Sequence, residues 1–490
     1  MGARATAAEI ATAHYPFTNT CVRHADHGGQ GTPSAPQVVA EAVAGGWFAI
    51  PVAQLGRVHK LERYSPAPLV AYNGAGNSQE DLQVNGDSVS RRGFMTRAAA
   101  ACAAGSTLAA SMRGVFAQAS QDEAKTATLR WGIIGTGTRG TFTHIPVIKE
   151  APQSQLVALC DVHEGRLRTA ASKVDHPVQT YSDYQQLLSD RDVNAVVIAS
   201  PNLFHREQLL AALQAGKHVL CEKPAGVTPA DAAAIESAAV TAGDKVVMFG
   251  MQYLNNARQR KLRELVDSGR IGKPKYLVQN VSRGDWNRSD NVWQYPDPKV
   301  NGGKPGNWRF SHAATGGTLN EFSCHYLDLL HWMVGAVPES VSCDGEIAVY
   351  KDGRNTWDCA TLMMKYPSGV AAVHTLSLFG PSRNELTVMG DEGSISTNDE
   401  AIRVSNPGGR GRNRGGAKSQ EIKPEETTPP GGKRSADRAT LMLFEDFLQC
   451  VTAGKKPEAS AARALAASRT CWLAELASER RAEVKWGELS

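Results

Sequence analysis

Two short segments carry side chains that are suited to moving a proton. Glu222-Lys223-Pro224 follows an apolar run, and the Lys223 ammonium could polarise a hydroxyl oxygen and stabilise an alkoxide as it develops. Glu321 and His325 are four residues apart in a segment with helical apolar spacing, so they should share one helix face. There His325 could take a hydroxyl proton, and Glu321 could orient the imidazole or share its charge. The pattern predicts acid–base chemistry on an alcohol, with Lys223, His325 and Glu321 as catalytic residues.

Each of these residues also has a simpler interpretation. Lys223 could be solvated or paired only with Glu222, and His325 could be a core histidine with satisfied hydrogen bonds. Glu321 and His325 could instead bind a metal, but the HExxH motif is absent and no third ligand has an obvious spacing, so we expect no metal site. Pro224 fits a rigid turn that aims Lys223, with a cis peptide bond as one form of that turn.

A glycine-rich turn offers a binding site for a pyrophosphate. Residues 129–134 are expected to form a buried strand, and Gly135-Thr136-Gly137-Thr138-Arg139-Gly140 follows at once, before a helical segment. The first glycine permits the tight turn, the second lets the backbone approach the phosphates, and the third lets the helix pack on the strand. Free N–H groups at the helix N-terminus then face the anion. The residues expected to contact a dinucleotide here are Gly135, Gly137, Thr138, Arg139 and Gly140.

A carboxylate after the next apolar run fits the ribose of the same nucleotide. Residues 156–160 are expected to form the second strand, and Asp161 follows it about 20 residues past the last glycine, as the dinucleotide fingerprint requires. Its oxygens would accept hydrogen bonds from the ribose hydroxyls and repel a 2′-phosphate. This favours NAD as the cofactor and leaves NADP open. The alternative is a helix N-cap or a surface aspartate.

Strands and helices alternate up to residue 250, and this order must position the residues above. Apolar runs at residues 195–199, 218–221 and 246–250 are separated by helical segments. Such alternation predicts an α/β fold with a doubly wound parallel sheet of the Rossmann type, which binds its ligand at the carboxyl ends of the strands. Side chains just after those ends should therefore contact the cofactor, and these are Ser200, Asn202, His205 and Glu222.

A polar, aromatic loop precedes the expected helix at residues 318–334. Flat aromatic faces beside Asn and Arg suit a sugar or another polyol, which has apolar C–H faces and hydroxyl edges. Packing of a long loop explains the same residues equally well. The residues expected to contact substrate are Trp286, Trp308 and Arg309; neighbours of the same chemical character are Asn287, Arg288, Trp293, Tyr295 and Asn307.

A second domain should follow, built on an antiparallel sheet. Strands are expected at residues 341–350, 360–366, 369–379, 385–390 and 394–397, with a further one at 275–283. An open antiparallel sheet with helices on one face gives an α+β domain, and its other face is a candidate interface for a homo-oligomer. Residues 406–437, rich in Gly, Arg, Lys and Pro, are expected to form a solvated, flexible loop rather than a nucleic-acid contact.

The N-terminal part has the features of an export signal. Residues 1–89 lack periodicity and are expected to be disordered or to reflect a mis-assigned start codon. Paired arginines at 91–92, a weakly apolar run at 98–110 and Ala117-Gln118-Ala119 follow in the order of an export signal, and the arginine pair resembles the twin-arginine type. A short amphipathic helix is the alternative. We expect a signal at residues 90–119 and export to the periplasm or beyond.

The composition excludes several other classes. The 490 residues suit two or three domains, which we place at residues 120–250 for the cofactor and 251–490 for the substrate and oligomerisation. A net charge of +4 is too small for nucleic-acid binding by charge alone. No apolar run is long enough to span a membrane, so stable insertion is not expected. The nine cysteines form no CxxC pair, which favours buried free thiols over a zinc module.

Together, the glycine turn, Asp161, the Ser200-Pro201-Asn202 segment with His205, and Glu222-Lys223-Pro224 resemble the Gfo/Idh/MocA (glucose-fructose oxidoreductase / inositol dehydrogenase) family. The resemblance extends over nearly all of residues 128–490. It includes a linking helix, a substrate helix, a closing helix and a last strand, expected at residues 262–272, 316–334, 444–457 and 478–486.

The sequence departs from the family pattern at two places. The family has Asp where this chain has Glu321, and it usually has an Arg near Gln252-Tyr253. Glu has one methylene more than Asp, so the first difference changes how far the carboxylate extends toward His325. The second difference means that the substrate of the family cannot simply be transferred to this chain.

The resemblance implies an NAD(P)-dependent oxidoreductase that transfers hydride from a sugar or polyol hydroxyl to a nicotinamide cofactor. For an exported enzyme we expect a tightly held cofactor that is regenerated in the site, because free nucleotide is scarce outside the cell. Two alternatives remain open. Some relatives are NAD-dependent glycosidases that oxidise a sugar transiently, and a non-catalytic sugar or nucleotide sensor could keep the same fold.

Overall fold

The protein is described by a computed structural model that covers residues 128–284, 286, 307–398, 401–406, 419–423 and 437–489. All described residues belong to one compact unit. The expected leader and signal, and the loop residues Asn287, Arg288, Trp293 and Tyr295, lie outside the described residues.

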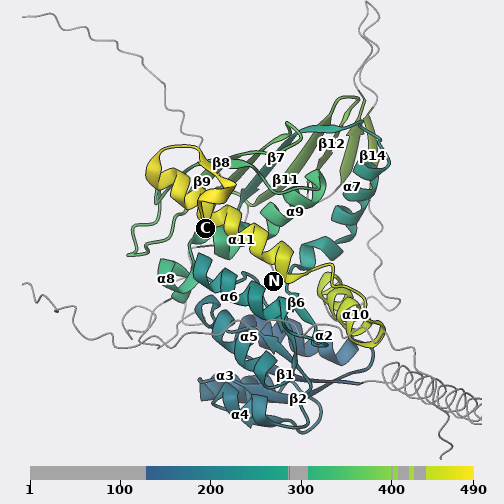
Figure 1. Cartoon of the computed structure of the whole chain (residues 1–490), viewed down its shortest axis with the longest axis vertical. Helices are drawn as coiled ribbons and strands as arrows, with labels where there is room; N and C mark the ends of the chain where they lie inside the picture. The colour runs from purple at the N-terminus through teal and green to yellow at the C-terminus, as the bar shows by residue number, and fades with distance from the viewer. Residues whose placement is uncertain are drawn as a thin grey trace, which may run out of the picture. The chain divides into compact units, whose positions relative to one another are not determined.

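Residues 129–249 form a six-stranded parallel sheet, coloured blue to teal in Figure 1. Its order is β3-β2-β1-β4-β5-β6. The strands are β1 (Leu129–Ile134), β2 (Ser154–Cys160), β3 (Gln179–Tyr181), β4 (Ala195–Ile198), β5 (His218–Cys221) and β6 (Val247–Phe249). Helices cover a parallel sheet on both faces, which explains why β1, β4 and β5 are almost continuously apolar and buried. The prediction of a doubly wound parallel sheet is confirmed.

Helices connect the strands of this sheet. They are α2 (Ile145–Glu150), α3 (Glu164–Ala171), α4 (Tyr184–Ser189), α5 (His205–Gln214) and α6 (Pro229–Val240). Helix α6 begins with a capping box, in which the Thr228 side chain accepts from the Asp231 N–H and Asp231 accepts from the Thr228 N–H. A π turn, Gly140–His144, precedes α2 directly after the glycine-rich turn.

The second sheet has nine strands and is mixed. Its order is β14-β13-β12-β11-β7-β10-β9-β8-β15, and every neighbouring pair is antiparallel except β7 and β10. The strands are β7 (Pro274–Ser282), β8 (Ser340–Glu346), β9 (Cys359–Lys365), β10 (Ala371–Ser377), β11 (Arg383–Gly390), β12 (Ser394–Thr397), β13 (Ile402–Ser405), β14 (Ser419–Ile422) and β15 (Val484–Lys485). The predicted antiparallel sheet is confirmed except at one pair, because β7 inserts between β10 and β11 instead of pairing with its neighbour in sequence.

Two further expectations for the second domain need correction. Strand β14 lies within residues 406–437, where a loop was expected, because it pairs with β13 at the sheet edge. Residues 478–480 belong to helix α11 (Ala461–Arg480), so the last strand is only β15. Sequence reasoning did not identify α11 as an element. Its many alanines leave one broad buried face instead of a stripe of large apolar residues.

The helices after residue 250 have different places in the fold. Helix α7 (Ala257–Asp267) leads to β7, and α9 (Cys324–Val334) follows a π turn at Leu319–Ser323. Helix α10 (Arg438–Ala453), yellow in Figure 1, returns to the first domain and packs against α2. There Phe444 and Phe447 contact Trp131 of β1 at ring-centroid distances of 4.9 and 5.0 Å. The C-terminal segment therefore supports the sheet that carries the glycine-rich turn.

The described part of the chain contains no helix that is both long and apolar enough to cross a membrane. Its seven cysteines are free thiols, of which five are buried and two, Cys343 and Cys359, are half-buried.

The buried histidines His331 and His374 should make the fold sensitive to acid. Burial lowers the pKa of each to about 3, below the usual value near 6.5 that the unfolded chain would show. Because the unfolded chain binds these protons more readily, stability should be complete above pH 6.5 and fall as the pH drops toward 3, by about 1.4 kcal/mol per pH unit for each site. Urea unfolding at pH 7, 6 and 5 checks this. His374→Gln should show a shallower decline, and equal slopes in the two proteins would contradict the assignment.

Candidate active site

A cavity of about 580 Å³ opens at the carboxyl ends of β1, β2, β4 and β5. Side chains from both domains line it, so the site is complete only when the second domain is present. The predicted site residues that form its wall are Gly135, Gly137, Thr138, Arg139, Asp161, Ser200, Asn202, His205, Glu222, Lys223, Trp308, Arg309 and Glu321. Three others, Gly140, Trp286 and His325, lie outside this wall.

The glycines of the turn have distinct geometric roles. Gly135 has a φ of +95°, and a Cβ there would meet the backbone at Ala199–Ser200 at 2.6 Å. A Cβ on Gly140 would lie 2.1 Å from the Gly135 carbonyl oxygen, so only glycine allows the π turn to approach the strand end this closely. A Cβ on Gly137 would meet no atom within 4 Å. The space beside Gly137 is part of the cavity, and it is the space that a pyrophosphate needs.

This geometry predicts opposite effects for two neighbouring substitutions. Gly140→Ala should lower the free energy of unfolding by about 1–3 kcal/mol, because the methyl group overlaps backbone atoms that cannot move away. Gly137→Ala should leave stability unchanged but weaken NADH binding at least about tenfold, because the methyl group occupies the phosphate space. Thermal unfolding and NADH fluorescence titration separate the two effects. Unchanged NADH affinity in Gly137→Ala would contradict the assignment.

Asp161 is nearly buried at the end of β2 and organises the turn. One carboxylate oxygen accepts from the Thr136 N–H at 2.8 Å and from its hydroxyl at 3.1 Å, and the other accepts from the His163 N–H at 2.8 Å. The carboxylate borders the cavity, where it can also accept from ribose hydroxyls. Asp161 is therefore neither a helix cap nor a free surface side chain.

Glu222 is engaged by the protein itself. Its Oε1 atom lies 2.6 Å from Arg139 Nε and 2.9 Å from His144 Nε2. Burial alone would raise the pKa of Glu222, but Arg139 and His144 hold it well below the usual range. Arg139, which Glu222 holds, belongs to the glycine turn and also contacts Thr440 of α10 at 3.4 Å. The alternative pairing of Glu222 with Lys223 is absent from the described contacts.

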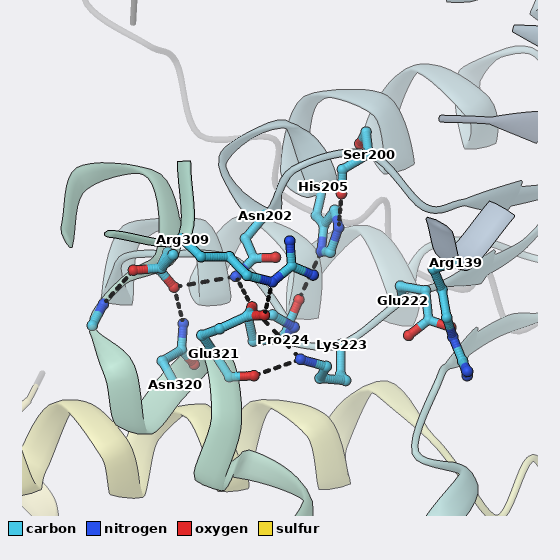
Figure 2. Close-up of polar contacts among 12 residues, drawn as sticks. Arg139, Ser200, Asn202, His205, Glu222, Lys223, Pro224, Arg309, Asn320 and Glu321 are labelled. Atoms are coloured by element: carbon cyan, nitrogen blue, oxygen red, sulfur yellow. Dashed lines mark hydrogen bonds and ion pairs between the residues drawn. The ribbon is translucent and has the colours of Figure 1, made fainter. Parts of the chain in front are cut away.

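His205 and Ser200 support the loop that carries Lys223. The two ring nitrogens of His205 lie 2.9 Å from the Pro224 carbonyl oxygen and 3.1 Å from the Ser200 carbonyl oxygen (Figure 2). Ser200 donates through its hydroxyl to Gln208 at 2.6 Å. The Lys223–Pro224 peptide bond is cis, as the turn interpretation allowed. These side chains border the cavity, but their polar atoms are used to fix the loops after β4 and β5.

Glu321 is the centre of the cluster drawn in Figure 2. Its carboxylate lies 2.9 Å from Arg309 Nε and 3.6 Å from Lys223 Nζ, and it accepts from the Asn202 amide at 2.7 Å. Lys223 also donates to the Glu321 carbonyl oxygen. Burial would raise the pKa of Glu321, but Lys223, Arg309 and Asn202 outweigh it and keep the pKa below its usual value. Glu321 therefore joins the first domain to the second as an anion.

The expectation that Glu321 orients His325 was wrong. No described contact joins the two side chains, and the Glu321 carboxylate is used by Lys223, Arg309 and Asn202. The reason is the π turn at Leu319–Ser323, whose wider spacing rotates the two residues away from the common face that an α-helix would give them. His325 is 8% exposed and stacks on the ring of Tyr253. Burial, with help from Lys223, lowers its pKa to about 3, so the imidazole is neutral at pH 7.

The two tryptophans expected at the substrate end have different positions. Trp308 borders the cavity, and the Arg309 guanidinium lies 4.1 Å from its ring centroid. Trp286 is buried and packs edge-on against Phe322, with ring centroids 5.5 Å apart. Packing, the alternative given above, is what the structure shows for Trp286. Arg309 reaches Glu321, so its guanidinium connects the aromatic wall to the charged cluster.

Sequence reasoning did not select several residues of the cavity wall. Asp183 and Tyr184 follow β3, where the strand-end rule would have found them, but β3 is three residues long and not apolar, so it gave no signal. The other unselected polar residues of the wall are Thr143, Arg166, Ser182, Gln208 and Gln252. Among the described residues, no group of three or more His, Cys, Asp or Glu side chains could hold a metal ion.

The fold and the cavity together define a class of protein. A parallel sheet with a glycine turn after β1, a carboxylate after β2 and open space beside Gly137 is a dinucleotide-binding domain. A lysine, an arginine and a carboxylate join it to a second domain at the other end of the cavity, which is the arrangement of a nicotinamide-dependent oxidoreductase.

Comparison with known proteins identifies the family. Residues 129–250 match the oxidoreductase family with an NAD-binding Rossmann fold, and residues 259–396 match the GFO/IDH/MocA C-terminal domain. The chain belongs to the Gfo/Idh/MocA family of oxidoreductases, and its first domain is the NAD-binding domain.

Three relatives give the extent of the similarity. The chain is 29% identical over 207 residues to an inositol 2-dehydrogenase of Salmonella typhimurium, covering 42% of this chain and 55% of that protein. It is 31% identical over 271 residues to a 1,5-anhydro-D-fructose reductase of Ensifer adhaerens, covering 54% of this chain and 74% of that protein. The crystal structure of an oxidoreductase domain protein from Kribbella flavida aligns with a TM-score of 0.64 at 25% identity, over 74% of this chain and all of that one. The chain thus spans about half the length of the inositol dehydrogenase.

Proposed function

We propose that this protein is an exported oxidoreductase that oxidises a hydroxyl group of a sugar or polyol with a tightly held NAD. The observation that carries the proposal is the cavity itself. A dinucleotide turn lies at one end, and Lys223, Arg309, Trp308 and Glu321 lie at the other. The names of two relatives, an inositol dehydrogenase and an anhydrofructose reductase, support polyols and sugars as the substrate class.

The residues suggest how the hydroxyl group would react. The glycine turn and Asp161 would hold NAD, which would supply the acceptor for the hydride as the C–H and O–H bonds of the hydroxyl-bearing carbon break and a C=O bond forms. Lys223 would donate a hydrogen bond to the substrate oxygen and stabilise the negative charge that develops there. His325 is neutral and would receive the hydroxyl proton. Glu321 would hold Lys223 and Arg309 in place, because its carboxylate contacts both.

The polar residues at the substrate end fit a neutral, hydroxylated ligand. Lys223 and Arg309 share one carboxylate, so their charges are partly compensated before any substrate binds. The Trp308 ring can contact the C–H face of a sugar, and the Lys223 ammonium, which also lines the cavity, can donate to hydroxyl oxygens.

The decisive experiment begins with freshly purified, undialysed protein. The protein is denatured, and released NAD and NADP are quantified by mass spectrometry against protein concentration. A nearly stoichiometric amount of NAD is expected, and the same preparation should be reduced by myo-inositol or another polyol, seen as absorbance at 340 nm. An empty protein that fails to bind added NADH would overturn the proposal. Hydrolysis of a chromogenic glycoside without net NADH would replace it with the glycosidase reaction.

Export and self-association are part of the same proposal. Support for export comes from the order of signal features in residues 90–119, and N-terminal sequencing of protein from the periplasm or medium tests it. Support for a homo-oligomer comes from the second sheet, where Met363 of β9 and Met389 of β11 are 54% and 39% exposed. Light scattering after gel filtration gives the molar mass. Met363→Lys should lower that mass if this face is the interface, and a monomeric wild type would contradict it.

A further inference from the structure

His325 lacks the hydrogen-bonded partner that usually fixes the orientation of a catalytic imidazole. Its Nδ1 atom is buried and has no hydrogen-bond partner in the described part of the chain. The nearby carboxylate of Glu321 is bound by Lys223, Arg309 and Asn202 instead. A ring held by no hydrogen bond can rotate about its side-chain torsions unless packing prevents it.

Tyr253 supplies that packing. Its ring lies 4.6 Å from the His325 ring, centroid to centroid, with 14° between the planes, so the two rings are stacked face to face. Tyr253 belongs to the short 3₁₀ turn Gln252–Asn255 directly after β6, whereas His325 belongs to α9 of the second domain. The stack therefore joins the end of the cofactor-binding sheet to the helix that carries the proton acceptor.

Contacts with Tyr326 hold the Tyr253 side chain in place. Its hydroxyl lies 3.3 Å from the Tyr326 hydroxyl, and the two rings are nearly perpendicular at 80°. Tyr326 in turn stacks on His374, whose Nε2 lies 2.9 Å from the Ser323 hydroxyl. This series of contacts reaches from β10 to the site, and it leaves the Tyr253 ring little freedom to turn away from His325.

We propose that Tyr253 is the positioning residue for His325, and that its ring face does for the imidazole what a hydrogen-bonded carboxylate does in many acid–base sites. The stack fixes the plane of the imidazole before substrate binds. It also favours the protonated ring, because a cation close to the face of a tyrosine is attracted by its π electrons. The proposal rests on the proposed function in one respect, the role of His325 as acceptor of the hydroxyl proton.

The test uses the full-length protein with its cofactor and four variants. Tyr253→Phe keeps the ring and loses only the hydroxyl contact to Tyr326, which Tyr326→Phe also removes, so the two form a matched pair. Tyr253→Leu removes the ring, and His325→Gln removes the acceptor. With myo-inositol and NAD, Tyr253→Leu should lower kcat by about threefold to thirtyfold, the range expected for losing one aromatic contact to a cation. The KM values should change less than about twofold, because binding contacts remain.

A spectroscopic readout works without turnover. Carbon-13 labelled histidine gives ring signals in NMR, and the signal lost in His325→Gln identifies His325. The stack should shift this signal upfield through the Tyr253 ring current. Tyr253→Leu should remove the shift, while Tyr253→Phe and Tyr326→Phe should keep it and retain kcat within about threefold of the wild type.

The two readouts separate the two proposals. If His325→Gln keeps the wild-type kcat, the proton-acceptor role in the proposed function is wrong, whatever the NMR spectrum shows. If His325→Gln is impaired but folded Tyr253→Leu keeps its kcat or its ring-current shift, the inference about Tyr253 is overturned. It is also overturned if Tyr253→Phe loses as much activity as Tyr253→Leu, since the hydroxyl would then matter and not the ring.

Discussion

Replacing Lys223 with methionine should lower kcat by about 10²- to 10⁴-fold, the range expected when a proton-transfer or charge-stabilising group is lost. Lys223 lines the cavity beside Glu321, and its Nζ lies 3.6 Å from the Glu321 carboxylate. It follows closely on the carboxyl end of β5. Methionine keeps the length and apolar stem of the side chain but removes its charge and its hydrogen-bond donors. NADH affinity should stay within about threefold, because the glycine turn and Asp161 are untouched.

The measurement combines steady-state kinetics with myo-inositol and fluorescence titration with NADH. Lys149→Met is the matched control, since Lys149 is an exposed lysine of the same domain that pairs with Asp175. It should behave as the wild type does. Lys223→Arg keeps the charge but cannot place a compact ammonium near the substrate oxygen, so it should recover only part of the loss. If Lys223→Met retains a kcat within about threefold of the wild type, the hydroxyl oxygen is stabilised by another group and a non-catalytic sensor gains support.

The cofactor half of the site was predictable because its signals are local. Each glycine of the turn is required by backbone geometry within a few residues, and the clashes that a Cβ would make at Gly135 and Gly140 explain why glycine stands there. Asp161, Ser200 and Lys223 follow buried strands, and parallel strands bring such positions to one edge. These residues can therefore be recognised from each strand and the few residues after it, without knowledge of tertiary contacts.

The contacts of the charged cluster around Glu321 were not predictable, because they join distant segments. Glu321 is bound by Asn202 and Lys223 from the first domain and by Arg309 from a loop. The four-residue spacing suggested that Glu321 orients His325. A π turn cannot be recognised from spacing alone, and its wider turn changes which side chains face each other. The stack of Tyr253 on His325 has the same origin, since it depends on how the 3₁₀ turn after β6 meets α9.

The pairing of strands in the second sheet also depends on contacts between distant segments. Consecutive strands were expected to be neighbours in the sheet, and this holds for β8–β9–β10 and for β11–β12–β13. Strand β7 instead pairs with β10 and β11, which come much later in the chain, after α9. Strand β14 forms because it can pair with β13 at the edge of the sheet. The polar sequence of β14 itself does not indicate a strand. Non-local pairing decides such strands, and propensity contributes little.

Replacing Glu321 with leucine should destabilise the protein by about 3–5 kcal/mol, the cost of leaving a buried charge without its partner. Glu321 is 3% exposed, and without its carboxylate Lys223 and Arg309 would face each other in the cavity wall. Glu321→Gln keeps the shape and the contact with Asn202, so it should lose less stability but still lose activity, because the negative charge between Lys223 and Arg309 is gone. Chemical denaturation and steady-state kinetics measure the two effects separately.

A second substitution and the pH dependence identify the cause of that loss. If charge repulsion is the cause, Arg309→Met combined with Glu321→Leu should be more stable than Glu321→Leu alone, because one of the two cations that repel each other is gone. The folded pKa of Glu321 lies below its usual value, so the carboxylate stabilises the protein above about pH 4.5 and this contribution fades as the pH falls through the lowered pKa. Glu321→Gln should therefore lack part of the wild-type loss of stability in acid. If the double variant is less stable than the single one and the acid profiles coincide, Glu321 acts through packing, and the electrostatic link between the two domains must be abandoned.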